Sequence, residues 1–350
     1  MFISLTVKNF KTFKEETFFS MEREGQYRKI KNYVNYYLEG RKKRENRLQL
    51  LKSVLVLGNN HCGKTALIEA ILAVRDLVIE GKFHYIPYGF NQEPILMAIE
   101  FIENEALYRY SVSYKEAVLL QEKLEVMDLK TQEYQEVFSE NECHQTPMIQ
   151  KERASQFFHK IKSFDEYEPC FSLLQNEENK QWMLNALQFL GFDLVNIDVT
   201  PMLHDEKLTW DVKGYHYFNP KIAVPIKEES TGLYKVIKLL LWIRWNKKER
   251  LCLIDDFEKD LYPQTASYLL YMLNRLDNEV QYMLTSHQIQ LMDEGLSKDQ
   301  LYILERYKEE VFLSSLADDE ELFSLRANKK YSEGVFAATA NKEEWDLLIE

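Results

Sequence analysis

The sequence contains an eight-residue segment whose glycines, lysine and threonine have the spacing of a phosphate-binding loop. The segment reads Gly58-Asn59-Asn60-His61-Cys62-Gly63-Lys64-Thr65. In the pattern G-x-x-x-x-G-K-[ST], backbone N–H groups wrap the phosphates of a nucleotide and the lysine reaches the β- and γ-phosphates. The threonine hydroxyl is offered to Mg²⁺, and the helix that follows points its positive end at the phosphates. We therefore predict nucleotide contacts from Gly58, Asn59, Asn60, Gly63, Lys64 and Thr65.

Two carboxylates follow an apolar segment in the last third of the chain. Residues 251–254 have the pattern of a buried strand, and Asp255 and Asp256 come directly after them. Taken alone, such a run is a common strand end. Downstream of a phosphate-binding loop, the first acid is the one that holds Mg²⁺ through water, and the second can polarise the attacking water. We predict a metal role for Asp255, together with Thr65, and a catalytic role for Asp256.

A histidine closes the next apolar run, Leu284-Thr285-Ser286-His287. A lone histidine at a strand end is usually incidental. Here one strand–helix–strand unit separates it from Asp255, and neighbouring parallel strands end at the same edge of a sheet. We predict that His287 has a catalytic role and contacts the γ-phosphate or its water from the edge of the site.

The segment Glu229-Ser230-Thr231-Gly232 precedes a strongly apolar helix. A serine or threonine here can cap that helix, and the glycine permits close approach of the backbone to an anion. One interpretation is a helix cap and nothing more. The other is a nucleotide contact, because the interval between Gly232 and Asp255 has room for one helix of about 15 residues and a turn.

The elements that must position these residues have the order of an α/β protein. Residues 53–57 are typical of a strand buried on both faces, and residues 66–78 are apolar at helical spacing. Near the carboxyl end, helix and strand alternate, which indicates a parallel sheet. The expected elements are helix 231–246, strand 250–255, helix 262–275 and strand 279–285.

Period-two patterns predict antiparallel strands elsewhere. The expected strands are 2–9 and 17–21 as a pair, 95–102, 107–114 and 118–127 as a meander, and 194–199, 208–212 and 222–225; residues 150–190 have a helical pattern. The predicted fold is an α/β P-loop NTPase head with a mixed sheet, an antiparallel β-meander and a short helical insertion. We expect a single domain over residues 1–350, with a basic insertion at about 25–52 and a helical, lid-like insertion at about 140–192.

Composition excludes several classes of protein. No run approaches the roughly 18 to 20 apolar residues that span a bilayer, and residues 1–7 alternate like a strand rather than a secretion signal. The four cysteines are scattered without a CxxC pair, which fits a reducing cytosol. We therefore expect a cytoplasmic protein with no membrane association.

The formal net charge is −12, so any nucleic acid would have to be bound by a local basic patch. One basic segment spans residues 28–52, and tyrosines are interleaved with its charges. Its basic residues are Arg28, Lys29, Lys31, Arg41, Lys42, Lys43, Arg44, Arg47 and Lys52. Two interpretations stay open, a solvated loop that leads into a strand and a contact for DNA or RNA.

The order of these motifs resembles ABC-type AAA ATPases, and in particular the SMC, Rad50 and OLD branch. The chain is most similar to the small stand-alone ATPases of prokaryotic antiphage-defence loci. Further matching pieces lie outside the core motifs: residues 7–13, the strand pair 99–101 and 108–110, Leu261-Tyr262-Pro263, and a tail with Leu316, Arg326, Lys330, Tyr331 and Gly334. The resemblance therefore extends over nearly the whole chain.

The resemblance implies that ATP and Mg²⁺ are the ligands. It also implies a dimer in which two chains face head to tail and sandwich two ATP molecules. Lys64 and Thr65 of one chain would then oppose Ser230 and Gly232 of the other, and Lys11 would lie near the base or the phosphates. ATP binding would close the dimer, and hydrolysis would open it.

Three positions depart from the family pattern. Asp256 stands where the family has glutamate, Asp260 where it has serine, and Tyr262 where it has histidine. An aspartate is one methylene shorter, so its carboxylate stops about 1.5 Å short, and a misplacement of about 1 Å can cost 10²-fold in rate. We expect slow hydrolysis and a long-lived ATP-closed state.

Some motifs of related proteins are not found in these residues. We find no heptad array for a coiled-coil arm and no HNH pattern, and we expect that the residues after 335 leave no room for a C-terminal Toprim nuclease. An effector would then act in trans, and the resemblance implies a sensor or regulatory ATPase that works with a nuclease or toxin encoded nearby. The alternatives are a DNA-repair or DNA-end-binding ATPase that uses residues 28–52, and a nearly non-hydrolysing, ATP-dependent scaffold.

Overall fold

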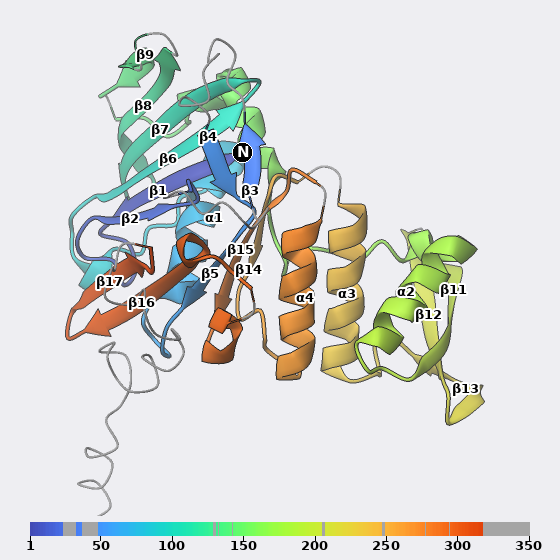
Figure 1. Cartoon of the computed structure of the whole chain (residues 1–350). Coiled ribbons are helices and arrows are strands. Elements are labelled where there is room, and N and C mark those ends of the chain that lie inside the picture. The colour runs from blue at the N-terminus through green and yellow to red at the C-terminus, as the bar shows by residue number, and fades with distance from the viewer. Residues whose placement is uncertain are drawn as a thin grey trace, which may run out of the picture. The chain divides into compact units, whose positions relative to one another are not determined.

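The computed structural model describes residues 1–23, 33–36, 48–128, 131, 133–141, 143–204, 207–246, 249–276, 278–293 and 295–317 (Figure 1). The chain divides into two compact units. The first contains the described parts of 1–165, 249–257 and 270–350, and the second those of 166–248 and 258–269. The first unit therefore holds the phosphate-binding loop, and the second holds the Ser230–Gly232 segment.

A mostly parallel sheet forms one half of the first unit. Its strand order is β10 (Ile161–Ser163), β14 (Leu251–Ile254), β15 (Gln281–Ser286), β5 (Ser53–Leu57), β16 (Leu301–Tyr307) and β17 (Glu310–Ser315). Only the pairing of β16 with β17 is antiparallel. Every residue of β5, β14 and β15 is buried, which explains why these strands are continuous apolar runs in the sequence.

An antiparallel sheet forms the other half of the first unit. Its strand order is β2 (Thr17–Ser20), β1 (Phe2–Lys8), β6 (Ile95–Glu103), β7 (Ala106–Lys115), β8 (Val118–Asp128) and β9 (Glu133–Glu140). The predicted strand pair and meander are confirmed. Strand β9 was not predicted, because most of its side chains are polar and none of them is buried.

Helix α1 (Lys64–Glu80) begins directly after the phosphate-binding loop and ends at Gly81, which adopts the left-handed conformation that commonly terminates helices. Its buried residues, among them Leu67, Ile71 and Val74, share one apolar core with side chains from both sheets. This shared core fixes the start of α1 against the carboxyl ends of the parallel strands.

The segment 150–190 was predicted to be helical, and that prediction is wrong in part. Residues 148–151, 153–160 and 171–175 form 3₁₀ turns, and only α2 (Glu177–Phe189) is an α-helix, with Asn176 as its N-cap. Between them, β10 adds an edge strand to the parallel sheet by pairing with Leu251–Leu253. Three residues are too few to show a periodicity, and their partner lies far along the chain.

The second unit contains α2, an antiparallel three-stranded sheet and helix α3 (Thr231–Trp245). The strands are β11 (Leu194–His204), β12 (Lys207–His216) and β13 (Asn219–Pro225). The predicted strands of this region and helix 231–246 are confirmed, and the strands are longer than expected. Trp242 of α3 is buried and stacks on Tyr167 with ring centroids 5.3 Å apart.

The remaining described elements are one helix, α4 (Pro263–Arg275), whose residues are divided between the two units, and several short strands and turns. The strands are β3 (Tyr33–Tyr36) paired with β4 (Leu48–Leu51), and the 3₁₀ turns are Tyr88–Phe90, Ile289–Asp293 and Lys298–Gln300. In the described part of the chain, no helix is long and apolar enough to cross a membrane.

A buried carboxylate connects the meander to the segment that follows it. Glu122 on β8 is fully buried. It accepts hydrogen bonds from the Tyr110 hydroxyl (2.9 Å) and from the backbone N–H groups of Met148 (2.8 Å) and Ile149 (3.0 Å). Nε2 of His144 lies 2.9 Å from its second oxygen. A buried charge held by this many donors makes the local structure depend on its acceptor oxygens.

Glu122→Gln is expected to lower the free energy of unfolding by about 1–3 kcal/mol, because the new amide places an N–H group against donors that need an acceptor. Urea denaturation measures this change. Glu136→Gln on β9, where the side chain is exposed, is the matched control and should stay within about 0.5 kcal/mol of the wild type. Equal stability of the two variants would contradict the role given to Glu122.

Candidate nucleotide-binding site

The phosphate-binding loop is packed so closely that two of its positions require glycine. A Cβ at Gly58 would lie 2.3 Å from the carbonyl oxygen of Leu304 and 2.6 Å from Sγ of Cys62. Gly63 has a φ of 114°, and a Cβ there would lie 2.6 Å from Oγ1 of Thr12. Such contacts are shorter than real Cβ atoms show. The loop conformation therefore depends on both glycines of the pattern.

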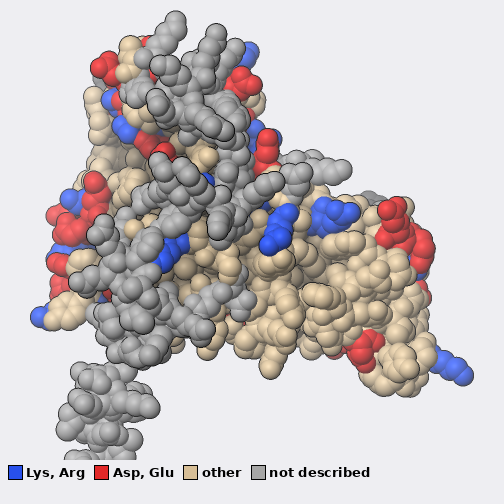
Figure 2. All heavy atoms as spheres, viewed as in Figure 1, with Lys and Arg blue, Asp and Glu red and all other residues tan. Residues whose placement is uncertain are grey.

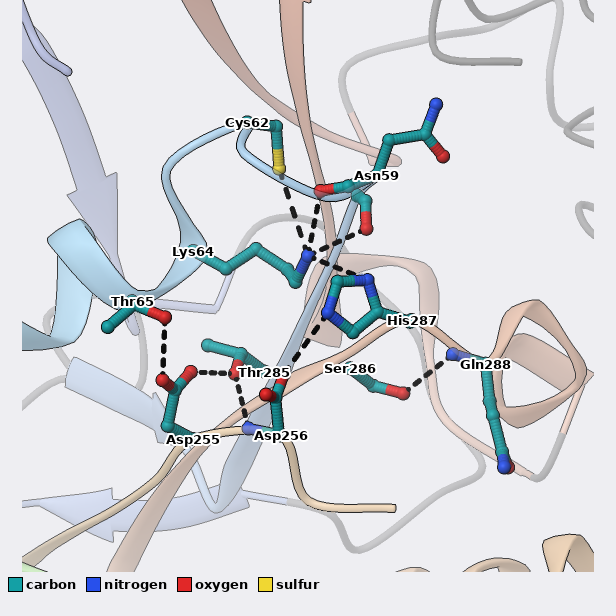
Figure 3. A network of polar contacts seen from close by, with 11 residues as sticks. Asn59, Cys62, Lys64, Thr65, Asp255, Asp256, Thr285, Ser286, His287 and Gln288 are labelled. Atoms are coloured by element: carbon teal, nitrogen blue, oxygen red, sulfur yellow. Dashed lines mark hydrogen bonds and ion pairs between the residues drawn. The ribbon is translucent and has the colours of Figure 1, made fainter. Parts of the chain in front are cut away.

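Lys64 is buried inside the loop (Figure 3). Its ammonium donates hydrogen bonds to the carbonyl oxygens of Gly58 (2.8 Å) and Asn59 (2.9 Å). Nδ1 of His287 lies 3.1 Å from the same ammonium. An ammonium can only donate, so Nδ1 accepts and the ring proton is carried on Nε2. The loop thus encloses a positive charge at the position where the pattern needs one.

The two residues predicted to bind metal lie in direct contact (Figure 3). The Thr65 hydroxyl donates to one carboxylate oxygen of Asp255 at 2.6 Å. The Thr285 hydroxyl donates to the other carboxylate oxygen, and it accepts from the backbone N–H of Asp256 at 2.9 Å. Thr285 was not predicted as a site residue; it orients Asp255 and joins the ends of β14 and β15.

The two residues predicted to be catalytic are also brought together. Oδ1 of Asp256 lies 3.2 Å from Nε2 of His287, so the imidazole connects the carboxylate to the Lys64 ammonium. Asp256 has a φ of 44°, a left-handed conformation that aspartate tolerates better than most residues. This backbone turns its side chain from the end of β14 toward His287.

Both residues line a pocket of about 390 Å³ in front of the loop, together with Asn60, Gly63, Lys64, Thr65 and Lys11. Lys11 forms an ion pair with Glu69 on α1, and its backbone is in the left-handed conformation, with a φ of 51°. Oγ1 of Thr12 is buried at the same place and has no hydrogen-bond partner among the described residues. An unsatisfied hydroxyl beside Gly63 is unusual in an interior, and it fits a site for a polar ligand.

Arg306 lines the same pocket and was not predicted. It lies on β16, which pairs with β5 far away in sequence, and its Nε donates to the carbonyl oxygen of Lys308 at 3.2 Å. Glu69 was missed for a similar reason, because its carboxylate reaches the pocket by pairing with Lys11. The sequence offered no signal for either residue beyond its position after an apolar run or a glycine loop.

The Ser230–Gly232 segment lies in the second unit and lines a pocket of its own, about 610 Å³ in volume. Oγ of Ser230 accepts a hydrogen bond from the backbone N–H of Leu233 at 3.3 Å, so the predicted cap of α3 is present. A Cβ at Gly232 would lie 2.5 Å from the carbonyl oxygen of Asp260. Gly232 is therefore required for contact between the start of α3 and the loop at Asp260.

Most of the basic segment 28–52 lies outside the described residues, as do the tail positions Arg326, Lys330, Tyr331 and Gly334. Lys52 is described and does not belong to an exposed patch. It is 4% exposed, and its ammonium donates to the carbonyl oxygens of Leu276 (2.6 Å) and Asn278. On the face in Figure 2, the described lysines and arginines are scattered among acidic and uncharged residues.

Three solved structures are similar to almost the whole chain. An SMC head domain from Thermotoga maritima is 13% identical, with 90% of this chain and 98% of that chain covered and a TM-score of 0.45. An Smc head with an extended coiled coil, bound to the C-terminal domain of ScpA derived from Pyrococcus furiosus, is 11% identical, with 92% and 98% covered and a TM-score of 0.47.

A third structure, an SmcHead bound to the C-winged helix domain of ScpA, is 12% identical, with 91% and 99% covered and a TM-score of 0.52. At this identity the likeness shows the fold alone. It confirms the predicted fold class, an ABC-type P-loop head in which a mixed sheet is combined with an antiparallel meander.

The sequence matches none of the curated proteins with which it was compared. Residues 53–293 match the model of a protein family described as "AAA domain, putative AbiEii toxin, Type IV TA system". The matched residues include the phosphate-binding loop, Ser230, Asp255 and His287. Because the match covers more than half of the chain, the protein belongs to this family of AAA-domain ATPases.

Proposed function

We propose that the protein is a regulatory ATPase that binds and hydrolyses ATP as a head-to-tail dimer, with one ATP held at each of two composite sites. The observation that carries this proposal is the network in Figure 3. It joins Lys64, Thr65, Asp255, Asp256 and His287, which come from three separate parts of the sequence.

The residues of the first unit fit ATP with Mg²⁺. Among the described residues, no cluster of three or more side chains drawn from His, Cys, Asp and Glu could hold a metal ion. Mg²⁺ prefers one or two protein oxygens and takes its other ligands from phosphates and water. Thr65 would supply one such oxygen directly and Asp255 would hold the ion through water, and the bound ion would neutralise charge on the β- and γ-phosphates.

The side chains around these residues have separate tasks in hydrolysis. Lys64 pairs with the phosphate charge, and Asp256 accepts a hydrogen bond from the attacking water. His287 holds the Asp256 carboxylate in place, since its Nε2 lies 3.2 Å from Oδ1. Lys11 lies at the rim of the pocket, where it can meet the base or the phosphates.

The Ser230–Gly232 pocket of the second chain would complete the site. The first turn of α3 presents backbone N–H groups, which favour an anion. Gly232 keeps this turn free of a side chain, and Ser230 adds a hydroxyl. On this proposal the two units act within one ATPase domain over residues 1–350, with insertions at about 25–52 and 140–192.

We propose that the protein acts in the cytoplasm, as a sensor or regulator in prokaryotic defence. The family description names a toxin–antitoxin system, and a similar head is bound to ScpA in its solved structure. Both support a partner protein, a nuclease or toxin, whose assembly or release is controlled by ATP. DNA binding through residues 28–52 stays a prediction that a salt titration of DNA affinity would test.

Light scattering on the purified chain tests the composite site. We expect a monomer without nucleotide or with ADP, and a dimer with ATP and Mg²⁺. Gly232→Ala is expected to weaken this dimer about 10-fold, because overpacking of the Asp260 contact costs about 1–3 kcal/mol. Binding of a fluorescent ATP analogue to the monomer should be unchanged by this substitution. A chain that stays monomeric with ATP would contradict the proposal.

A further inference from the structure

A histidine in the second unit lies between two carboxylates. Nδ1 of His216 is 2.6 Å from Oδ1 of Asp193, and its Nε2 is 2.7 Å from Oε1 of Glu229. The His216 and Glu229 side chains are only 12% and 10% exposed. His216 also stacks on Phe218, with ring centroids 5.2 Å apart. The ring is thus held on both edges and on one face.

Two carboxylates at hydrogen-bond distance require a donor on each ring nitrogen. A neutral imidazole has one N–H donor and one acceptor, whereas the imidazolium has two donors. Burial disfavours the charge, but the hydrogen bonds to Glu229 and Asp193 outweigh it, and the pKa of His216 is raised. The protonated ring is therefore the form that satisfies both contacts.

Two titratable groups that neighbour His216 on β12 have partners of their own. Lys213 on β12 forms an ion pair with Asp211 at 2.8 Å, and Tyr215 is hydrogen-bonded to Asp198 on β11. The two groups that act on His216 are therefore Asp193, in the loop after α2, and Glu229, in the segment before α3.

These two carboxylates directly flank two of the segments that line the Ser230–Gly232 pocket. Asp193 directly follows Gly191 and Phe192, which line the pocket from the loop after α2. Glu229 directly precedes Ser230, Thr231 and Gly232, which line it from the start of α3. The imidazolium therefore connects the end of the loop after α2 to the segment before α3, both of which adjoin the pocket lining.

We propose that His216 is a positioning residue of the composite ATP site: its bridge from Asp193 to Glu229 holds the lining segments 189–192 and 230–232 of the Ser230–Gly232 pocket in the arrangement that receives ATP from a second chain. The inference rests on the proposed function, since the pocket acts only in the ATP-bound dimer. It adds a residue that contacts neither ATP nor Mg²⁺.

The bridge makes the dimer sensitive to pH in a defined direction. The folded-state pKa of His216 is raised above the ordinary value of 6.5, so the bridge is complete below that value. It is lost as the pH rises through the raised pKa, because one carboxylate then faces an acceptor nitrogen. The ATP-dependent dimer is therefore expected to weaken as the pH rises above 6.5.

Dimer dissociation constants with ATP and Mg²⁺, measured against pH, test the inference. His216→Gln should weaken the dimer about 10-fold at the acidic end, because the charged bridge between the two carboxylates is lost, and should flatten the pH dependence. Glu229→Gln tests whether a neutral imidazole can keep the bridge. Its amide donates to the neutral ring, so the dimer should form with little dependence on pH. His159→Gln, at an exposed position of the first unit, should behave like the wild type.

Two readouts separate the inference from the proposed function. Binding of a fluorescent ATP analogue to the monomer reports the phosphate-binding loop alone and should be unchanged in all variants. A wild-type chain that binds the analogue but never dimerises overturns the composite site, and this inference with it. A wild-type chain that dimerises, with His216→Gln and Glu229→Gln retaining its affinity and pH profile, overturns the inference alone.

Discussion

Lys64→Ala is expected to lower the affinity for ATP about 100-fold and to abolish turnover. The ammonium is buried in the loop and is held by the carbonyl oxygens of Gly58 and Asn59. A charge-assisted hydrogen bond to a phosphate contributes about 1.5–3 kcal/mol, which corresponds to roughly 10- to 150-fold in affinity for each bond. Isothermal titration calorimetry with ATP and Mg²⁺ measures the loss.

Lys82→Ala is the matched control for this variant. Lys82 lies just beyond the other end of α1, and its side chain is exposed. The control should bind ATP as the wild type does. If Lys64→Ala and Lys82→Ala bound ATP with equal affinity, the loop would not be the nucleotide site.

Asp256→Glu is expected to raise the rate of ATP hydrolysis about 10- to 100-fold. The aspartate carboxylate stops about one bond length short of the reach that a glutamate would have, and a misplacement of about 1 Å can cost 10²-fold in rate. In the structure the Asp256 carboxylate is turned toward His287 at 3.2 Å. Single-turnover phosphate release from the ATP-bound dimer measures the chemical step apart from nucleotide exchange.

Asp256→Asn provides the comparison in the opposite direction, because it keeps the length of the side chain and removes its charge. It should bind ATP and form the dimer, but it should release phosphate more slowly than the wild type. A wild-type chain that hydrolyses ATP as fast as Asp256→Glu would contradict slow hydrolysis. If Asp256→Asn released phosphate as fast as the wild type, Asp256 would have no role in the chemical step.

Local patterns predicted much of the fold. The strands β5, β14 and β15 are buried on both faces, and their apolar runs identified each of them. The alternation along β6 to β8 identified the meander for a similar reason. Strand β10 was missed because its three residues belong to the sheet only through pairing with β14. Pairing between segments far apart in sequence leaves no periodicity.

The site residues, like the strands, fall into those that local patterns predict and those that depend on long-range pairing. Lys64, Asp255 and His287 were predicted because each directly follows an apolar strand or a glycine loop, and neighbouring parallel strands bring these ends together. Thr285 and Arg306 were missed, since their contribution depends on which strands lie side by side.

The sequence was misleading at one charged residue. Lys52 was counted with the basic segment, although it is buried and its charge is satisfied by the carbonyl oxygens of Leu276 and Asn278. A run of basic residues does not show which of them face solvent. The contact that buries Lys52 comes from the loop after α4, far along the chain.

In the proposed dimer, one ATP is held by the loop of one chain and the Ser230–Gly232 pocket of another. A mixture of two inactive variants tests this arrangement. Lys64→Ala inactivates the phosphate-binding loop by removing its ammonium group, and Gly232→Trp fills the pocket. Neither variant alone therefore has an intact site. In a mixed dimer, one of the two sites takes its intact loop from one chain and its intact pocket from the other.

Phosphate release is measured for each variant and for their equimolar mixture. We expect the separate variants to be inactive and the mixture to recover about a quarter of the wild-type rate, because random pairing makes half of the dimers mixed, each with one intact site. No recovery in a mixture that demonstrably exchanges chains would contradict the composite site. So would full activity of Gly232→Trp alone, because each chain would then complete its own site.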